Sequence, residues 1–406
     1  MKFCPECGVK LISQKFCHEC GCNIATYLGG GEGTSLSFGN ESVGASTLGG
    51  GFESFDFSAL QNAASQQLSQ ENEKKKFYNN AEVSGTALVK YKGSEETVVI
   101  PEGITTIKNS AFYYASAKTI KVPASVSEIE ESSLYCANAQ CYEVDKENKH
   151  YKSIDGVVYS KDGKILIQYP NGKSGYYNMP NEVEQVKRSA ISGCVKLTGL
   201  SLSSRLTKID DFMFCGTTFQ TLEIPSNITS IGKNAFEMCT ALTSITIPGS
   251  VVTIGSSAFS CCEGLRSVTI NEGVVSIEPY AFFNCTSLTS VSIAGSVNSL
   301  GSYAFQQCRA LQSINIPRGI STVKAGAFAY CDSLSNVTLE EGVRTIESEA
   351  FNNHCLKSVK IPQSVQSIAN SAFPSSWGFS GGGFKMYVPR GRRYGLDTYG
   401  REFIDY

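Results

Sequence analysis

The chain has 406 residues, a formal net charge of −2 at pH 7, 16 cysteines and only three histidines. This charge excludes the strongly basic nucleic-acid binders, and no apolar run reaches the roughly 18 to 20 residues that span a bilayer. His18, His150 and His354 lie far apart, which disfavours catalysis built on histidine. The N-terminus lacks the apolar core of a secretory signal, so we expect a cytoplasmic protein with reduced thiols.

Two C-x-x-C pairs open the chain within residues 1–25, Cys4 with Cys7 and Cys17 with Cys20. Each pair aims two thiolates at one point, and four sulfurs in a tetrahedron suit Zn²⁺. A redox C-x-x-C would instead be a single motif near a βαβ unit. The spacing therefore predicts one structural Zn²⁺, whose binding supplies the folding energy of a segment too short for an apolar core.

These residues resemble the zinc-ribbon modules at the start of many bacterial proteins, with the pattern F-C-P-x-C-G, a short spacer and F-C-x-x-C-G. The resemblance implies one zinc ion and a small β-hairpin but no reaction. Some zinc ribbons bind nucleic acid, and Lys2, Lys10 and Lys15 are basic, although two glutamates offset them. We prefer a structural or docking module, with nucleic-acid binding through the ribbon as an alternative.

Residues 26–76 are predicted to form a flexible Gly/Ser-rich linker. The stretch 26–70 contains two Gly-Gly-Gly runs and no Lys or Arg. Such a composition cannot bury enough apolar surface to offset the entropy of ordering it. A short helix is predicted over residues 58–77, supported by the pairing of Glu71 with Lys75 at i,i+4.

Residues 77–406 carry a 23-residue repeat marked by an Ala-Phe pair. The regular pairs are Ala235-Phe236, Ala258-Phe259, Ala281-Phe282, Ala304-Phe305, Ala327-Phe328 and Ala350-Phe351. A fixed period of this length predicts a solenoid. One copy offers about six buried side chains, worth roughly 9 to 18 kcal/mol. Ordering its backbone costs roughly 23 to 46 kcal/mol, so neighbouring coils must stack.

Within one copy, Ile245 and Ile247 alternate with polar residues and predict a short strand with one buried face. Pro248 ends that strand, and Ala258 with Phe259 fills the far side of the coil. We count about eleven copies, with β caps expected at both ends because open coil ends expose core and strand edges. An insertion over residues 142–175 contains two Asp-Gly turns and is predicted to form a hairpin.

The repeat is similar to that of the BspA-like leucine-rich repeat family. The pattern I-P-x-x-V-x-x-I-x-x-x-A-F-x-x-C-x-x-L-x-x-I is seen from Ile224 to Ile245. The resemblance implies a β-rich leucine-rich repeat solenoid over residues 83 to about 390. Members of the family are often surface adhesins or host-protein binders. An adhesin exported by an unconventional route is therefore an alternative to a cytoplasmic protein.

Six cysteines share one repeat position. They are Cys194, Cys239, Cys262, Cys285, Cys308 and Cys331. A metal or redox array is one interpretation of this ladder. We prefer a column of small buried thiols, because free cysteine behaves as a small hydrophobe.

The outward side chains of the predicted strands form two columns of hydroxyl and amide groups. Their members are Ser244, Thr246, Ser267, Thr269, Ser290, Ser292, Ser313, Asn315, Asn336 and Thr338. In a leucine-rich coil these positions line the strand face, the usual binding surface. The alternative is simple solvation, since such residues suit an exposed strand.

The columns are uncharged and poor in aromatic residues, which argues against nucleic acid as the partner. The sequence also lacks a phosphate-binding loop, a nucleophile elbow and an H-E-x-x-H motif. We therefore predict a non-enzymatic scaffold that binds a protein partner, with the zinc ribbon as a structural or docking module.

Overall fold

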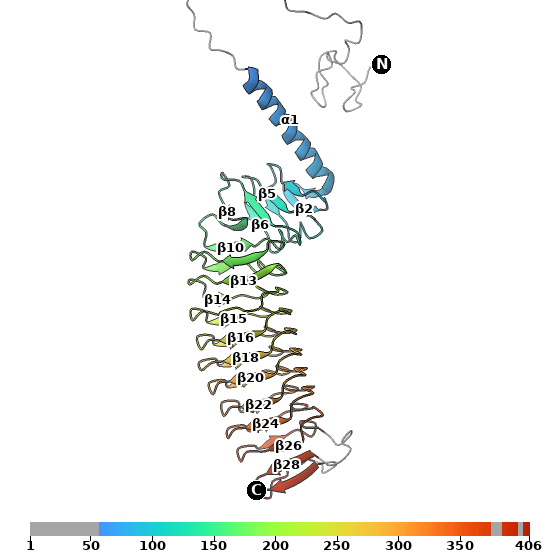
Figure 1. Cartoon of the computed structure of the whole chain (residues 1–406), viewed down its shortest axis with the longest axis vertical. Coiled ribbons are helices and arrows are strands. Elements are labelled where there is room, and N and C mark those ends of the chain that lie inside the picture. The colour runs from blue at the N-terminus through green and yellow to red at the C-terminus, as the bar shows by residue number, and fades with distance from the viewer. Residues whose placement is uncertain (1–56, 375–383, 397–400) are drawn as a thin grey trace, which may run out of the picture. The chain divides into compact units, whose positions relative to one another are not determined.

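A computed structural model describes residues 57–374, 384–396 and 401–406 of the chain. The predicted zinc module, with Cys4, Cys7, Cys17 and Cys20, lies outside the described residues, as does most of the predicted linker. Helix α1 (Phe57–Asn80) forms where a short helix was predicted, and it leads into a β-solenoid of about 13 turns (Figure 1).

Two columns of strands run along the solenoid, with one strand of each column in a regular turn. The long strands are β3 (Thr97–Val99), β5 (Thr119–Val122), β7 (Cys141–Val144), β11 (Gly175–Asn178), β13 (Leu197–Ser201), β16 (Ser244–Ile247), β18 (Ser267–Ile270), β20 (Ser290–Ile293), β22 (Ser313–Ile316), β24 (Asn336–Leu339), β26 (Ser358–Lys360), β28 (Phe384–Val388) and β29 (Arg401–Asp405). Their outward side is called the long-strand face below. Neighbouring long strands pair in parallel wherever they share a sheet.

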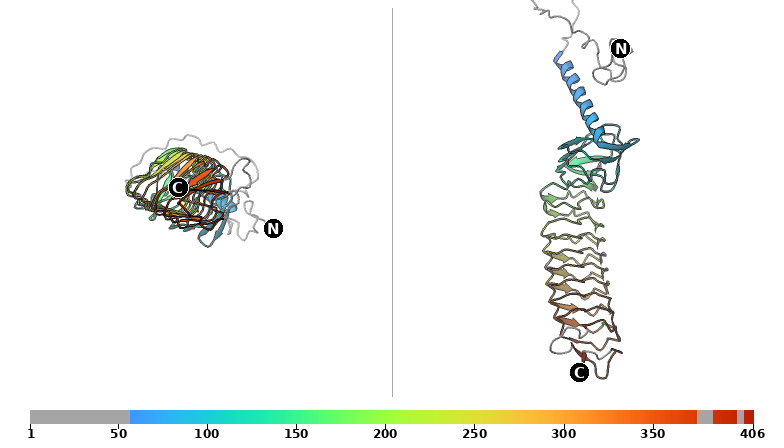
Figure 2. Two further views of the ribbon diagram at one scale, coloured as in Figure 1. Left: turned by 90° about the horizontal axis from the view of Figure 1, so that it is seen from below. Right: turned by 90° about the vertical axis from the view of Figure 1, so that its right-hand side faces the viewer.

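The second column consists mostly of two-residue strands. These are β2 (Ala87–Tyr91), β4 (Thr106–Ile107), β6 (Glu128–Ile129), β12 (Gln185–Val186), β14 (Lys208–Ile209), β15 (Ser230–Ile231), β17 (Thr253–Ile254), β19 (Ser276–Ile277), β21 (Ser299–Leu300), β23 (Thr322–Val323), β25 (Thr345–Ile346) and β27 (Ser367–Ile368). Seen along the axis, the turns overlie one another (Figure 2).

The Ala-Phe segments make the third side of each turn, and their backbone also bonds to the next turn. In one turn the N–H groups of Asn234, Phe236 and Met238 donate to carbonyls one turn further on, at 3.0, 2.7 and 2.8 Å. Asn234 and Met238 adopt left-handed φ angles of 55° and 59°, which turn alternate N–H groups along the solenoid axis. All three sides therefore carry hydrogen bonds between turns.

The aromatic rings of these segments form a continuous stack in the core, as predicted. Phe259 and Phe282 are fully buried, with ring centroids 5.1 Å apart and planes 2° from parallel. The stack continues through Phe305 and Phe328 at spacings of 5.0 and 5.4 Å. Successive coils thus place like residues in contact along one axis.

The regular spacing of the cysteine ladder has a hydrogen-bonding function that sequence analysis did not predict. Each regular ladder thiol is buried and donates to a phenylalanine carbonyl of the preceding turn, for example Cys262 to Phe236 at 3.1 Å and Cys285 to Phe259 at 3.2 Å. Burial raises the pKa of Cys285 well above its ordinary value, so the thiol keeps the proton that it donates. Each of these two carbonyls also accepts a backbone N–H of its own turn, so the thiol adds a second hydrogen bond that links neighbouring turns.

The predicted insertion contains three antiparallel strands, and the turn between the first two has left-handed Asp155 and Gly156. The strands are β8 (Tyr151–Ile154), β9 (Val157–Ser160) and β10 (Ile165–Gln168). Its side chains enter two adjoining cores. Val158 packs in the N-terminal core, whereas Val157 and Tyr159 pack in the larger core that follows. The hairpin therefore joins the two parts of the solenoid.

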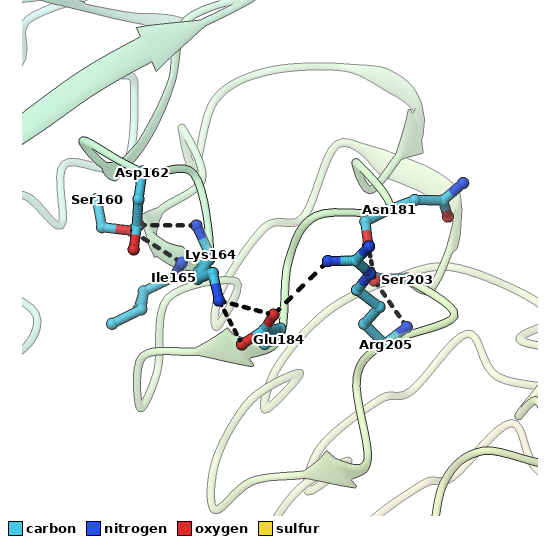
Figure 3. A network of polar contacts seen from close by, with 8 residues as sticks. All are labelled: Ser160, Asp162, Lys164, Ile165, Asn181, Glu184, Ser203 and Arg205. Atoms are coloured by element: carbon cyan, nitrogen blue, oxygen red, sulfur yellow. Dashed lines mark hydrogen bonds and ion pairs between the residues drawn. The ribbon is translucent and has the colours of Figure 1, made fainter.

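A surface network ties the insertion to the next two turns (Figure 3). The Glu184 carboxylate forms an ion pair with Lys164 at 3.1 Å and a second one with Arg205 at 3.7 Å. Lys164 belongs to the insertion. The backbone N–H of Arg205 donates a hydrogen bond to Ser203 Oγ at 3.1 Å. These side chains are about half exposed, so the network orients the turns but adds little stability.

Further strands flank the regular turns at both ends of the solenoid. At the N-terminal end β1 (Ala81–Ser84) pairs antiparallel with β2, and Phe77 of α1 stacks on Tyr91 at 5.3 Å. At the C-terminal end β28 and β29 continue the column without an Ala-Phe pair. The solenoid thus extends two strands beyond the last Ala-Phe pair, Ala372-Phe373.

Candidate partner-binding face

The predicted columns lie side by side on the long-strand face. The register pairs Ser244 with Ser267 and Ser290, and Thr246 with Thr269 and Ser292 in the same way. Further along, Ser313 pairs with Asn336 and Asn315 with Thr338. All ten side chains are exposed except Ser267, which is half-buried.

Strand geometry explains why these residues face outward. In β16 the burial alternates along the strand, with Ile245 and Ile247 inside and the two hydroxyl residues outside. Because side chains alternate between faces, a 23-residue period with this pattern places like residues above like. The uncharged strip ends where Glu223 occupies the column at one end and Lys360 at the other. The two columns therefore offer many hydrogen-bonding groups and contain no charged side chain between these two residues.

The loops beside this face are held by a recurring carboxylate clamp. Glu272 accepts the N–H groups of Gly295 and Ser296 of the next turn at 2.8 and 3.1 Å. In return Ser296 Oγ accepts the N–H of Gly273 at 3.0 Å. Gly273 has a φ of 110°, which glycine tolerates best. The clamp fixes the spacing of the loops along one border of the face.

The same clamp recurs at two other turns, formed by Glu102 and by Glu341. Glu341 accepts the N–H of Gln363 at 2.9 Å and that of Ser364 at 3.0 Å. The Gln363 N–H, together with the N–H of Ser364, lowers the pKa of Glu341 below its usual value. Hydrogen bonding to the charged form thus keeps this carboxylate ionised.

Two grooves lie along the long-strand face. The first, of about 520 Å³, is bounded by α1 and the turns of β3, β5 and β7. Lys121 and Glu143 pair across its lining at 3.0 Å. The second, of about 670 Å³, extends from β24 past β26 to Tyr387 and Tyr406. Asn336 and Thr338 of the predicted columns belong to this second groove, whereas its two tyrosines were not predicted.

Arg390, Arg392 and Arg393 cluster in the C-terminal cap, and all three are exposed. Two of these arginines also contact neighbouring residues. Arg392 donates to the carbonyl of Val365 at 2.7 Å, and Arg393 pairs with Asp405 at 2.6 Å. These arginines hold the cap and are not an independent basic patch.

Within residues 57–374, 384–396 and 401–406, no group of three or more His, Cys, Asp or Glu side chains is arranged to hold a metal ion. In the same part of the chain no helix has the length and apolar character needed to cross a bilayer.

Comparison with known families matches residues 86–164, 169–274 and 252–378 to the family described as BspA type Leucine rich repeat region, in six copies. The chain matches none of the curated proteins with which it was compared. The family match covers most of the solenoid and includes the repeat from which the long-strand face is built.

Two solved structures share the fold. A leucine-rich repeat protein from Eubacterium ventriosum is 31% identical with a TM-score of 0.52, covering 55% of this chain and 61% of its own. This chain thus spans less than two thirds of that relative's length. The pneumococcal vaccine antigen PcpA is 16% identical with a TM-score of 0.51, covering 81% of this chain and 97% of its own. The second likeness shows the fold alone.

Proposed function

The chain belongs to the BspA-type leucine-rich repeat family, and from this premise we propose that it is a non-enzymatic scaffold whose long-strand face binds a protein partner. The observation that carries the proposal is the strip of ten uncharged hydroxyl and amide side chains, in register within β16 to β20 and within β22 to β24. Repeat proteins commonly use such extended surfaces for binding. The partner's surface must be polar, because an apolar one would leave these groups without hydrogen bonds.

Site-specific photo-crosslinking tests this proposal. A photoreactive residue replaces Thr246 or Ser292 on the long-strand face, and Val252, half exposed on another side of the same solenoid, is the matched control. In the source cell we expect the same protein adduct from both face positions and none from the control. Adducts from the control alone, or from no position, contradict the proposal.

We place the protein in the cytoplasm. All cysteines of the described residues are free thiols, among them exposed Cys355. Unpaired cysteines at this density suit a reducing compartment. The rival function is an adhesin exported by an unconventional route. Protease added to intact cells should spare a cytoplasmic protein and cut an adhesin.

We also propose that Cys4, Cys7, Cys17 and Cys20 hold one Zn²⁺ in an N-terminal ribbon. The support is their paired spacing in the sequence. The ribbon then serves as a structural or docking module beside the solenoid. Nucleic-acid binding is the alternative role, and it predicts an affinity that falls steeply with salt.

A further inference from the structure

The second groove, at the C-terminal end of the long-strand face, carries chemistry that the rest of the face lacks. Tyr387 and Tyr406 are 37% and 45% exposed at its border. Four polar side chains line it as well: Asn336, Thr338, Ser358 and Gln363. Within the described part of the chain, none of these four side chains makes a hydrogen bond, so all are available to a ligand.

The lining of the groove carries no net charge. Its lining contains one lysine and one glutamate. The Lys360 ammonium lies 4.4 Å from the centre of the Tyr406 ring, and Tyr406 is itself held by its hydroxyl bond to the carbonyl of Ile361 at 2.7 Å. The Glu341 carboxylate is occupied by the N–H groups of Gln363 and Ser364. An ionic ligand would meet both a cation and an anion in this lining, so the groove favours neither sign of charge and suits a neutral ligand.

The groove is also a poor fit for a peptide anchored by apolar side chains. Its apolar members Val337, Leu339 and Val359 are only 7%, 8% and 2% exposed, and Pro362 is buried too, so they present no pocket for an anchor. Pairing of a peptide backbone requires a free strand edge, whereas this groove lies over strand faces. Available amide and hydroxyl groups beside aromatic rings remain as the recognition elements.

From this combination we propose that the groove binds a neutral oligosaccharide. Sugar hydroxyls both donate and accept hydrogen bonds, as do the hydroxyl and amide side chains of Asn336, Thr338, Ser358 and Gln363. The apolar face of a sugar ring packs on an exposed aromatic side chain, which here is Tyr387 or Tyr406. This site goes beyond the proposed protein-binding role, since it depends on tyrosines outside the uncharged strip.

Calorimetric titration of the full chain tests the site, with soluble cello-, laminari-, manno-, xylo- and chito-oligosaccharides as probes. We expect saturable binding of at least one, with a Kd between about 10 μM and 1 mM. Tyr387→Ala and Gln363→Ala should each weaken it, the tyrosine change by about tenfold. Tyr114→Ala is the matched control, because Tyr114 is 64% exposed and lies in the N-terminal turns. Gln363 and Tyr114 are exposed, so these two variants should keep the melting temperature of the parent chain.

Three results would overturn the proposal: no binding of any probe at about 10 mM, tighter binding of a sulfated oligosaccharide, or equal weakening by Tyr114→Ala. The outcome is separable from that of the proposed function. A photoreactive residue at Thr246 should leave sugar binding unchanged, and Tyr387→Ala should leave the protein adduct at Thr246 unchanged. Binding of peptides alone would likewise contradict the sugar assignment.

Discussion

Replacing Phe282 by alanine should destabilise the middle of the solenoid by about 4 to 5 kcal/mol, the upper part of the range for buried phenylalanine. The ring is fully buried and lies between Phe259 at 5.1 Å and Phe305 at 5.0 Å. The neighbouring rings are held by their own turns, so the cavity cannot collapse. Each lost stacking contact adds about 0.5 to 1.5 kcal/mol beyond the buried area, which places the cost near the top of the range.

Native-state hydrogen exchange measures this loss turn by turn, which matters because long repeat arrays need not unfold in one step. We expect the protection to fall around Phe282 and to stay unchanged near Phe373, since stability in a solenoid is a sum of neighbouring terms. Phe282→Leu is the matched control and should cost about 1 to 2 kcal/mol. A Phe282→Ala loss below about 1 kcal/mol, or one spread evenly over all turns, would refute the stacked core.

Three further predictions concern single groups. Cys285→Val keeps the shape of the thiol side chain but removes its hydrogen-bond donor. Denaturant unfolding should show a free energy of unfolding lower by about 1 to 2 kcal/mol, and a smaller loss for Cys285→Ser. An unchanged free energy of unfolding would mean that the thiol hydrogen bond does not contribute to stability. The Gln363 N–H is the first cause of the lowered pKa of Glu341. The ionised carboxylate therefore stabilises the fold at pH values above its pKa in the unfolded state. This stabilisation is lost as the pH falls through the pKa of the folded state. In urea titrations, the free energy of unfolding should therefore change less between pH 7 and acidic pH in Glu341→Gln than in the parent chain. An equal change in both proteins argues against the clamp. Metal analysis should find about one zinc per chain, lost in Cys4→Ser or Cys17→Ser, and a zinc-free parent chain removes the ribbon.

Much of the fold follows from two periods in the sequence. The 23-residue spacing of Phe259 and Phe282 predicts a stack, and the alternation around Thr246 predicts which side of a strand is outside. Both patterns depend only on local geometry repeated at a fixed interval. For that reason the core and the outward columns could be predicted residue by residue.

Other features depend on backbone conformation that the repeat pattern does not reveal. Tyr280 and Tyr303 occupy left-handed positions where other turns have Asn, Ser, Gly, Phe or Glu, and their rings stack at 5.1 Å. Gly326 takes the next such position because the Tyr303 ring fills the space that a Cβ would need. The contact of such a ring with the following turn cannot be read from the sequence and is found only in the structure.

The second groove was missed for a different reason. Tyr387 and Tyr406 lie in the C-terminal cap, outside the regular repeat, so no periodic pattern marks them. Their meeting with Asn336 and Thr338 depends on how the last strands follow β26. Sequence analysis could therefore predict that Asn336 and Thr338 face outward here, but it could not predict that the two tyrosines lie beside them.

The continuity of the long-strand face can be measured directly as a distance between Thr246 and Thr338. Spin labels carried on unnatural amino acids avoid the native thiols, and pulsed electron resonance reads the separation. Four steps between neighbouring turns, each about 4.8 Å, predict a backbone separation of about 19 Å, broadened by the label tethers. A distribution centred beyond about 35 Å would mean that the turns do not form one uninterrupted surface.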